Sequence, residues 1–174
     1  MRRDVTRAFG HYLAPAMVEK LARDPKALKL GGERRELTIL FSDVRNFTVL
    51  AESMKDEPER LTQLINRLLT PLSDAVLERG GTIDKFIGDC IMAFWNAPLD
   101  DPDHARHAVE AGLAMLASVE GVNRELRAEL GENAPALSIG VGINSGVCVV
   151  GNMGSTRRFD YSVLGDAVNY ASRL

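Results

Sequence analysis

The sequence predicts an α+β fold in which a mostly antiparallel β-sheet carries helices on one face. Apolar, strand-like runs are joined by tight turns, and longer segments have apolar residues at helical spacing. The expected order is β-α-α-β-β-α-β-β-β-α, which lacks the strict β-α alternation of a parallel sheet. The chain has 174 residues, 45% hydrophobic and 26% charged, which is typical of one globular domain.

The first segment, residues 1–33, is expected to be a helical connector ahead of a domain at residues 34–174. Apolar residues recur at helical spacing from Val5 to Leu21, and Pro15 is expected to begin a second helix. No apolar run reaches the roughly 18 residues that a membrane span requires. The start of the chain also lacks the apolar core of a secretory signal.

The elements of the domain are expected to follow one another with short connections. Strands are indicated by apolar, β-branched runs, and helices by apolar residues every three or four positions. We expect a strand at 36–43, helices at 46–54 and 57–79, a hairpin of strands at 82–87 and 90–95, a helix at 103–130, strands at 137–144 and 147–151 paired across Asn144–Gly146, a strand at 159–163, and a helix capped by Asp166. The apolar positions expected along the helix at 103–130 include Val109, Leu113, Leu116, Val119, Leu126 and Leu130.

Two aspartates stand at strand ends. Asp43 closes the apolar run Leu37–Ser42, and Asp89 lies in the turn of the expected hairpin. A carboxylate beside a buried sheet is costly unless it is paired, solvated or bound to a cation. Separately, Asp43 fits a helix N-cap and Asp89 a turn residue. Together they predict a site for two Mg²⁺-type ions about 3.5–4 Å apart, beside a helix N-terminus able to hold a polyphosphate.

Other polar side chains add to this hypothesis. Strand alternation places Lys85 on one face with Ile83 and Ile87, although a lysine snorkelling at the sheet margin is the simpler reading. Asn169 and Arg173 are four residues apart, so on a helix they would share one face. Taken alone, this spacing also fits an ordinary exposed helix face. Two acids, a lysine, an amide and a guanidinium together favour a nucleotide-phosphate site.

Charge and cysteine content narrow the function classes. The net charge is −3, from 21 basic and 24 acidic residues, which gives no support for nucleic-acid binding. Cys90 and Cys148 both lie in strand-like runs. Two buried thiols without a disulfide framework fit a reducing compartment.

The chain resembles the class III nucleotidyl cyclase catalytic domain of bacterial type, from about Arg34 to Leu174. The stretches that carry the resemblance are Phe41–Thr48, Asp84–Asp89, Gly140–Gly146, Val150–Ser155 and Gly165–Leu174. The resemblance implies the ferredoxin-like, palm-like core of that family and a cytoplasmic domain, fused to an upstream sensor or membrane-anchored region. It also implies that the C-terminal end of the domain, with a further phosphate-binding lysine, lies beyond Leu174.

The resemblance also implies a role for each site residue. Asp43 and Asp89, with the Val44 carbonyl, are similar to the ligands of two Mg²⁺ or Mn²⁺ ions. Further residues similar to family site positions are Lys85 and Ser162 for the base, Phe47 and Thr48 for substrate binding, Asn169 for the ribose, and Arg173 for the α-phosphate. One chain contains both sets, which fits a homodimer with shared active sites.

The resemblance therefore implies an adenylate cyclase, which converts ATP into 3′,5′-cyclic AMP and pyrophosphate in signal transduction. Lys85 can donate a hydrogen bond to adenine N1, and Ser162 can accept one from N6. Ser162 is a departure, because similar adenylyl cyclases more often carry aspartate or threonine there. The alternatives are a guanylate cyclase, which typically has glutamate in place of Lys85, and a catalytically silent dimerisation or regulatory module.

Overall fold

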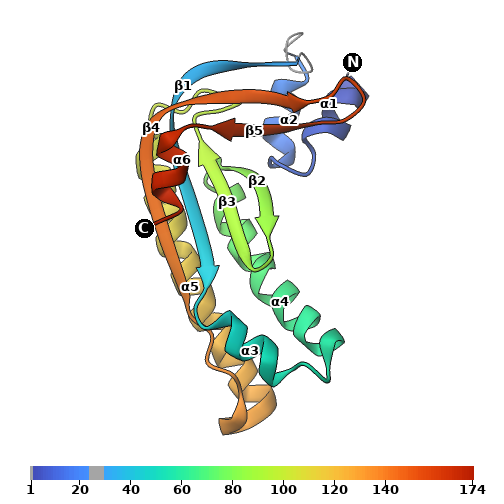
Figure 1. Ribbon diagram of the computed structural model, residues 1–174, viewed down its shortest axis with the longest axis vertical. Coiled ribbons are helices and arrows are strands. Elements are labelled where there is room, and N and C mark those ends of the chain that lie inside the picture. Colours follow the sequence, from blue (N-terminus) through green and yellow to red (C-terminus); the bar gives the residue numbers. More distant parts are fainter. Residues whose placement is uncertain (1, 24–29) are drawn as a thin grey trace.

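The computed structural model describes residues 2–23 and 30–174 of the chain. Five strands form one sheet in the order β2-β3-β1-β4-β5, and each neighbouring pair is antiparallel (Figure 1). The expected α+β fold is confirmed. The elements are α1 (Arg2–Phe9), α2 (Pro15–Leu21), β1 (Gly31–Val44), α3 (Phe47–Ser53), α4 (Pro58–Leu77), β2 (Thr82–Ile87), β3 (Cys90–Trp95), α5 (His104–Leu130), a 3₁₀ turn (Gly131–Asn133), β4 (Ile139–Gly154), β5 (Phe159–Leu164) and α6 (Asp166–Ala171).

The long antiparallel pair β1–β4 is the centre of the sheet. β1 pairs with β4 along all of its 14 residues, so the hairpin expected across Asn144–Gly146 is wrong. Ser145 lies in the ladder opposite Thr38, and their hydroxyl oxygens are 2.7 Å apart. The local turn signal is overruled because β1 offers a hydrogen-bonding partner to every residue of this segment.

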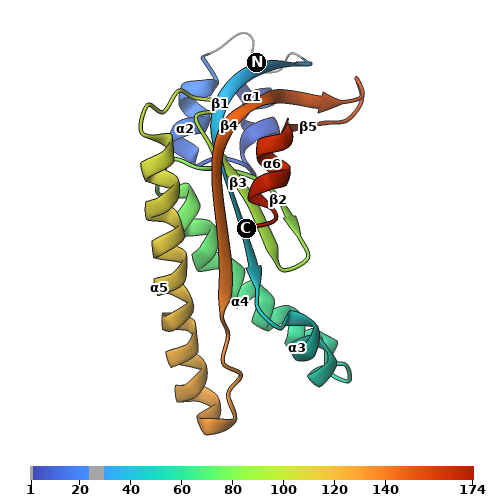
Figure 2. The same ribbon diagram turned by 60° about the vertical axis from the view of Figure 1, so that its left-hand side comes forward.

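The long helices α4 and α5 cover one face of the sheet, as expected. Their apolar side chains form the first core cluster with strand residues such as Leu40, Ile91 and Trp95. Figure 2 shows α5 on one side of β1 and β4, and α6 on the other side. None of the helices in the described part of the chain is long and apolar enough to cross a membrane.

The buried face of α5 differs from the expected one. Val109, Leu113 and Leu116 are 49%, 63% and 44% exposed, while Val119 and Leu126 are buried as expected. Small residues take the inner positions instead, including Ala108, Ala111 and Gly112. A Cβ atom at Gly112 would lie 3.3 Å from the Ile143 side chain, so the helix packs closely on β4 and a larger residue would require Ile143 to shift.

The short helices α1, α2 and α6 lie against the opposite face of the sheet. Val5, Phe9 and Leu13 are buried in a second core cluster, which includes Leu37 and Ile39 of β1. The predicted helix start at Pro15 is confirmed. The boundary between a connector and a domain at residue 33 stays a prediction, and residues 1 and 24–29 of that connector lie outside the described residues.

A β-bulge in β2 changes which way its side chains point. The register moves from Ile83 opposite Ala93 to Lys85 opposite Met92, so Asp84 is the extra residue. Ala93 belongs to the first core cluster and Met92 to the second. The expectation that Lys85 shares a face with Ile83 is therefore wrong, because simple alternation fails at a bulge.

The β4–β5 ribbon bends over the sheet, so that β2 and β5, the two edge strands of the sheet, meet. Figure 1 shows β5 crossing near the start of β2, although three strands separate them in the sheet order. The Ser162 hydroxyl on β5 donates a hydrogen bond of 2.8 Å to the Asp84 carboxylate on β2. Helix α6 follows, with Gly165 at its N-cap position, so Asp166 lies in the first turn and is not the cap.

Candidate functional site

The end of β1 and the turn between β2 and β3 form an acidic corner, which we define as Asp43, Val44 and Asp89. Because β1 and β3 are antiparallel neighbours, the last residues of β1 lie beside the turn that leads into β3. The Val44 N–H donates a hydrogen bond of 2.9 Å to Asp89 Oδ2. The two aspartates that the sequence singles out are thus brought together by strand register.

The pKa of the Cys90 thiol reflects the negative charge of this corner. Burial raises the pKa of Cys90, and the negative charges of Asp43 and Asp89 raise it further. Both carboxylates therefore lie close enough to act on one group. Across the described residues, no group of three or more histidine, cysteine or acidic side chains could hold a metal. Two carboxylates and a backbone carbonyl still fit Mg²⁺, which takes its other oxygens from water and substrate phosphates.

A cavity of about 270 Å³ opens beside the corner. Asp43, Arg45 and Arg173 line it, together with the backbone of β4 at Gly140–Gly142. The absence of a side chain at Gly140 makes room for the Arg45 guanidinium, which lies where a Cβ atom would stand. The sequence analysis did not single out Arg45, although a cation two residues after a candidate metal ligand is a usable signal.

Helix α3 begins directly after the acidic corner. Asn46 has a left-handed backbone, with φ of 55°, and turns the chain from β1 into the helix. No side chain caps this N-terminus. Phe47 packs against the first core cluster, while Thr48 is exposed in the first turn. The substrate-binding roles of Phe47 and Thr48 stay predictions.

Asp84 links Lys85 and Ser162, the two residues predicted to contact the base. Ser162 donates its hydroxyl proton to Asp84 Oδ2, and Lys85 Nζ lies 3.7 Å from Asp84 Oδ1. We call Asp84, Lys85 and Ser162 the Asp84 cluster. The sequence analysis missed Asp84 as a site residue, because the bulge that turns it toward β5 has no signal in the alternation pattern.

Asp84 is an unusual carboxylate. Its side chain is 1% exposed, and Oδ1 is buried without a hydrogen-bond partner. Burial raises the pKa of Asp84, while the Ser162 hydrogen bond and the Lys85 charge lower it in part. Burying a carboxylate oxygen without a hydrogen bond costs free energy, which the nearby Lys85 charge offsets in part.

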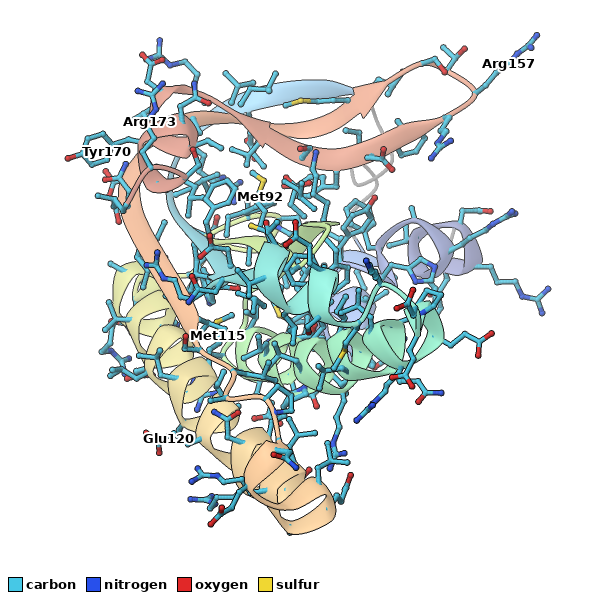
Figure 3. All side chains as sticks on the ribbon, turned by 60° about the horizontal axis from the view of Figure 1, so that its bottom comes forward. Met92, Met115, Glu120, Arg157, Tyr170 and Arg173 are labelled. Carbon is cyan, nitrogen blue, oxygen red and sulfur yellow. The ribbon has the colours of Figure 1, made fainter. Side chains whose placement is uncertain are left out.

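Helix α6 ends at Ala171, so Asn169 lies on it while Arg173 lies two residues past its end, and the two do not share one helix face as expected. Arg173 lines the cavity of the acidic corner, whereas Asn169 is exposed and is not among the residues that line it. Figure 3 shows Tyr170 on α6 pointing away from the molecule, with Arg173 just past the end of the helix. Lys85 and Ser162 do not line this cavity either. One chain therefore contains two separate groups of predicted site residues.

Comparison with protein families gives one match over most of the chain. A model described as the adenylate and guanylate cyclase catalytic domain matches residues 32–174. Adenylate cyclase 1 of Rhizobium meliloti is 34% identical over 172 residues, which cover 99% of this chain and 25% of that protein. The chain therefore spans about a quarter of the length of this curated relative.

Solved structures of similar sequence share the fold. The adenylyl cyclase CyaB from P. aeruginosa is 44% identical with a TM-score of 0.75, covering 83% of this chain and 72% of that chain. The guanylyl cyclase Cya2 is 38% identical with a TM-score of 0.76, covering 83% of this chain and 71% of that chain. Overall similarity therefore leaves open the choice between the two nucleotides, which must be argued from side chains.

Proposed function

The chain belongs to the family of adenylate and guanylate cyclase catalytic domains, and we propose that it converts ATP into 3′,5′-cyclic AMP and pyrophosphate. The observation that carries the choice of ATP is the Asp84 cluster. Lys85 supplies a donor suited to adenine N1, and Ser162 supplies an oxygen that can accept from the N6 amino group. Guanine presents the opposite polarity at both positions, so the same cluster disfavours GTP.

The acidic corner is the proposed binding place for two Mg²⁺ or Mn²⁺ ions. Asp43 and Asp89 supply carboxylate oxygens and Val44 its carbonyl, and the Val44 N–H already orients Asp89. Bound there, the ions would lower the pKa of the ribose 3′-hydroxyl and neutralise phosphate charge. The chain contributes fixed oxygen ligands at a position that solvent and substrate can reach, because Asp43 is exposed.

The proposed reaction is an intramolecular displacement. The ribose 3′-oxygen forms a bond to the α-phosphorus, the bond from that phosphorus to the bridging oxygen breaks, and the hydroxyl proton passes to solvent or phosphate. Asn169 would hold the ribose, and Arg173 would stabilise negative charge on the α-phosphate oxygens in the transition state. Arg45 is a second cation beside Asp43 that could hold the triphosphate.

We propose that two copies of the chain share each active site. Exposed apolar side chains lie on the β4–β5 ribbon and α6, where Val147, Val149, Leu164 and Tyr170 are 54%, 40%, 63% and 60% exposed. Val149 and Leu164 are paired across the ribbon, so the patch is continuous there. A contiguous apolar patch of this kind favours an interaction surface. A second copy could then bring its Asp84 cluster to the acidic corner.

The domain is proposed to act in intracellular signalling, with α1 and α2 linking it to an upstream sensor region. These helices pack in the same core cluster as Tyr161 and Val163, which flank Ser162 on β5. A shift of α1 could therefore reach the Asp84 cluster through direct packing. The proposed coupling between α1 and β5 rests on this shared core alone.

A product assay tests the proposed function. The full-length protein is incubated with ATP or GTP, in Mg²⁺ and in Mn²⁺, and the products are separated. We expect cyclic AMP from ATP and little cyclic GMP. A preference for GTP would favour the guanylate cyclase alternative, and no product from either nucleotide would favour a catalytically silent module.

A further inference from the structure

We propose that Asp84 determines nucleotide specificity by fixing the Ser162 hydroxyl as a hydrogen-bond acceptor. This inference rests on the proposed function of the Asp84 cluster. In the structure the Ser162 hydroxyl donates its single proton to Asp84 Oδ2 over 2.8 Å. Its lone pairs are then the groups left for a third partner, and the adenine N6 amino group is a donor that matches them.

A serine alone could not make this choice. A free hydroxyl rotates, so it accepts from the adenine amino group or donates to the guanine O6 oxygen with similar ease. The carboxylate of Asp84 removes the second option, because the hydroxyl proton is already engaged. Asp84 thus gives Ser162 the acceptor polarity that an aspartate at position 162 would have by itself.

The backbone geometry around Asp84 serves this contact. The bulge between Ile83 and Lys85 inserts Asp84 as an extra residue, and the bent β4–β5 ribbon brings Ser162 to it from the opposite sheet edge. The Ile83 N–H donates to the Tyr12 carbonyl over 2.9 Å, so the turn between α1 and α2 closes the strand edge beside the bulge. A buried, acceptor-only group is the result.

The charge of Lys85 completes the arrangement. Lys85 Nζ lies 3.7 Å from Asp84 Oδ1, the oxygen without a hydrogen-bond partner. This opposite charge favours the ionised form of Asp84, which is the form that accepts from Ser162. The same attraction holds the ammonium group near Ser162, so one carboxylate aligns both residues predicted to contact the base.

The test measures kcat/KM for ATP and GTP in the full-length protein. Asp84→Ala frees the Ser162 hydroxyl, so the ATP-to-GTP ratio of kcat/KM should fall about tenfold or more, as loss of a buried polar match typically does. Ser162→Ala should also lower the ratio. Adding Asp84→Ala to Ser162→Ala should lower the ratio by less than Asp84→Ala does in the unmodified protein, because only the alignment of Lys85 is then left to lose.

Moving the carboxylate from position 84 to position 162 distinguishes an effect on nucleotide specificity from a structural defect. Ser162→Asp in the Asp84→Ala background should restore the ATP preference, because the new side chain accepts directly. Asp84→Asn, which is nearly the same size, shows whether a folding defect explains the Asp84→Ala result. Asp160→Ala is the matched control, since Asp160 on the same strand also binds a hydroxyl, that of Tyr12 at 3.1 Å, and should leave the ratio unchanged.

The outcomes separate the two proposals. If the unmodified protein forms neither cyclic nucleotide, the proposed function fails. If it forms cyclic AMP but folded Asp84→Ala keeps its ATP-to-GTP ratio, only the role of Asp84 is overturned. A lowered ratio that Ser162→Asp does not restore would also overturn it, because a purely structural Asp84 would then explain the loss.

Discussion

The acidic corner and the Asp84 cluster both depend on aspartates, but the two regions are built in opposite ways. The corner joins elements that are neighbours in the sheet, and Asp43 is exposed there. The cluster joins the two edge strands β2 and β5, and the side chain of Asp84 is 1% exposed. The exposed carboxylate at the corner can exchange water for a cation, whereas buried Asp84 is engaged with Ser162 and Lys85 and sets the polarity of their hydrogen bonds.

The largest expected effect is at the acidic corner. Asp43→Ala and Asp89→Ala should each abolish turnover of ATP in the full-length protein, because each removes a ligand that the other cannot replace. The double variant should be little worse than either single one, since residues that act as a unit are not additive. Circular dichroism should show an intact fold. Near-normal activity of either variant in Mg²⁺ would contradict the metal assignment.

The next effect concerns base choice at the Asp84 cluster. Lys85→Glu combined with Ser162→Cys should strongly depress ATP use and admit some GTP, because each lost hydrogen bond costs about 1–3 kcal/mol. Steady-state kinetics with both nucleotides measure the change. An unchanged ATP-to-GTP ratio would show that these residues do not contact the base.

A smaller effect is expected from weakening the second core cluster, which lies beside the Asp84 cluster, while the acidic corner is left unchanged. Phe9 is 1% exposed and packs edge-on against Tyr161, with ring centroids 5.3 Å apart. Phe9→Ala should therefore lower the free energy of unfolding by about 3–5 kcal/mol. It should also loosen β5 beside Ser162 and leave metal affinity at the corner unchanged.

Denaturant unfolding and metal titration check this prediction. Arg7→Ala is the matched control, because Arg7 is exposed on the same helix, and such surface changes stay within about 0.5 kcal/mol. If Phe9→Ala leaves the unfolding transition unchanged, α1 is a separate connector and not part of the core.

The smallest effect is on stability against pH. Burial raises the pKa of Asp84 from its ordinary value of 3.8, so the unfolded chain loses this proton at lower pH than the folded chain. The free energy of unfolding should therefore fall as pH rises from 3.8 through the raised pKa. Asp84→Asn removes this loss, so the difference between the two proteins should grow with pH over that window. A constant difference would contradict the raised pKa.

The acidic corner could be predicted from the sequence, but the Asp84 cluster could not. The apolar run that ends at Asp43 and the turn at Asp89 are local signals, and adjacent strands bring them together. A bulge at Asp84 leaves no local signal, and simple alternation placed Lys85 on the wrong face. The contact of Asp84 with Ser162 spans 78 residues along the chain, so it depends on how the whole sheet bends.

Local signals also failed where long-range pairing or close packing decides the outcome. The turn-like residues Asn144–Gly146 stay in one strand because β1 pairs with them throughout. The large apolar residues Val109 and Leu113 of α5 face outward because the helix lies close to β4 at Gly112. Turn propensity and helical periodicity describe single elements, whereas these two features depend on what each element packs against.

We propose that the acidic corner of one chain forms one active site with the Asp84 cluster, Asn169 and Arg173 of another chain. Within one chain, Asp43 and Arg173 line the same cavity. The competing arrangement is therefore an active site that is complete within each chain. A mixture of full-length Asp43→Ala and Arg173→Ala chains, each inactive alone, distinguishes the two arrangements. With free exchange, half the dimers are mixed and about a quarter of all sites should be intact, by two-fold symmetry. Recovery of about a quarter of the unmodified activity is the result we predict. A mixture that stays inactive, although a labelled subunit shows that the chains exchange, would contradict the shared site.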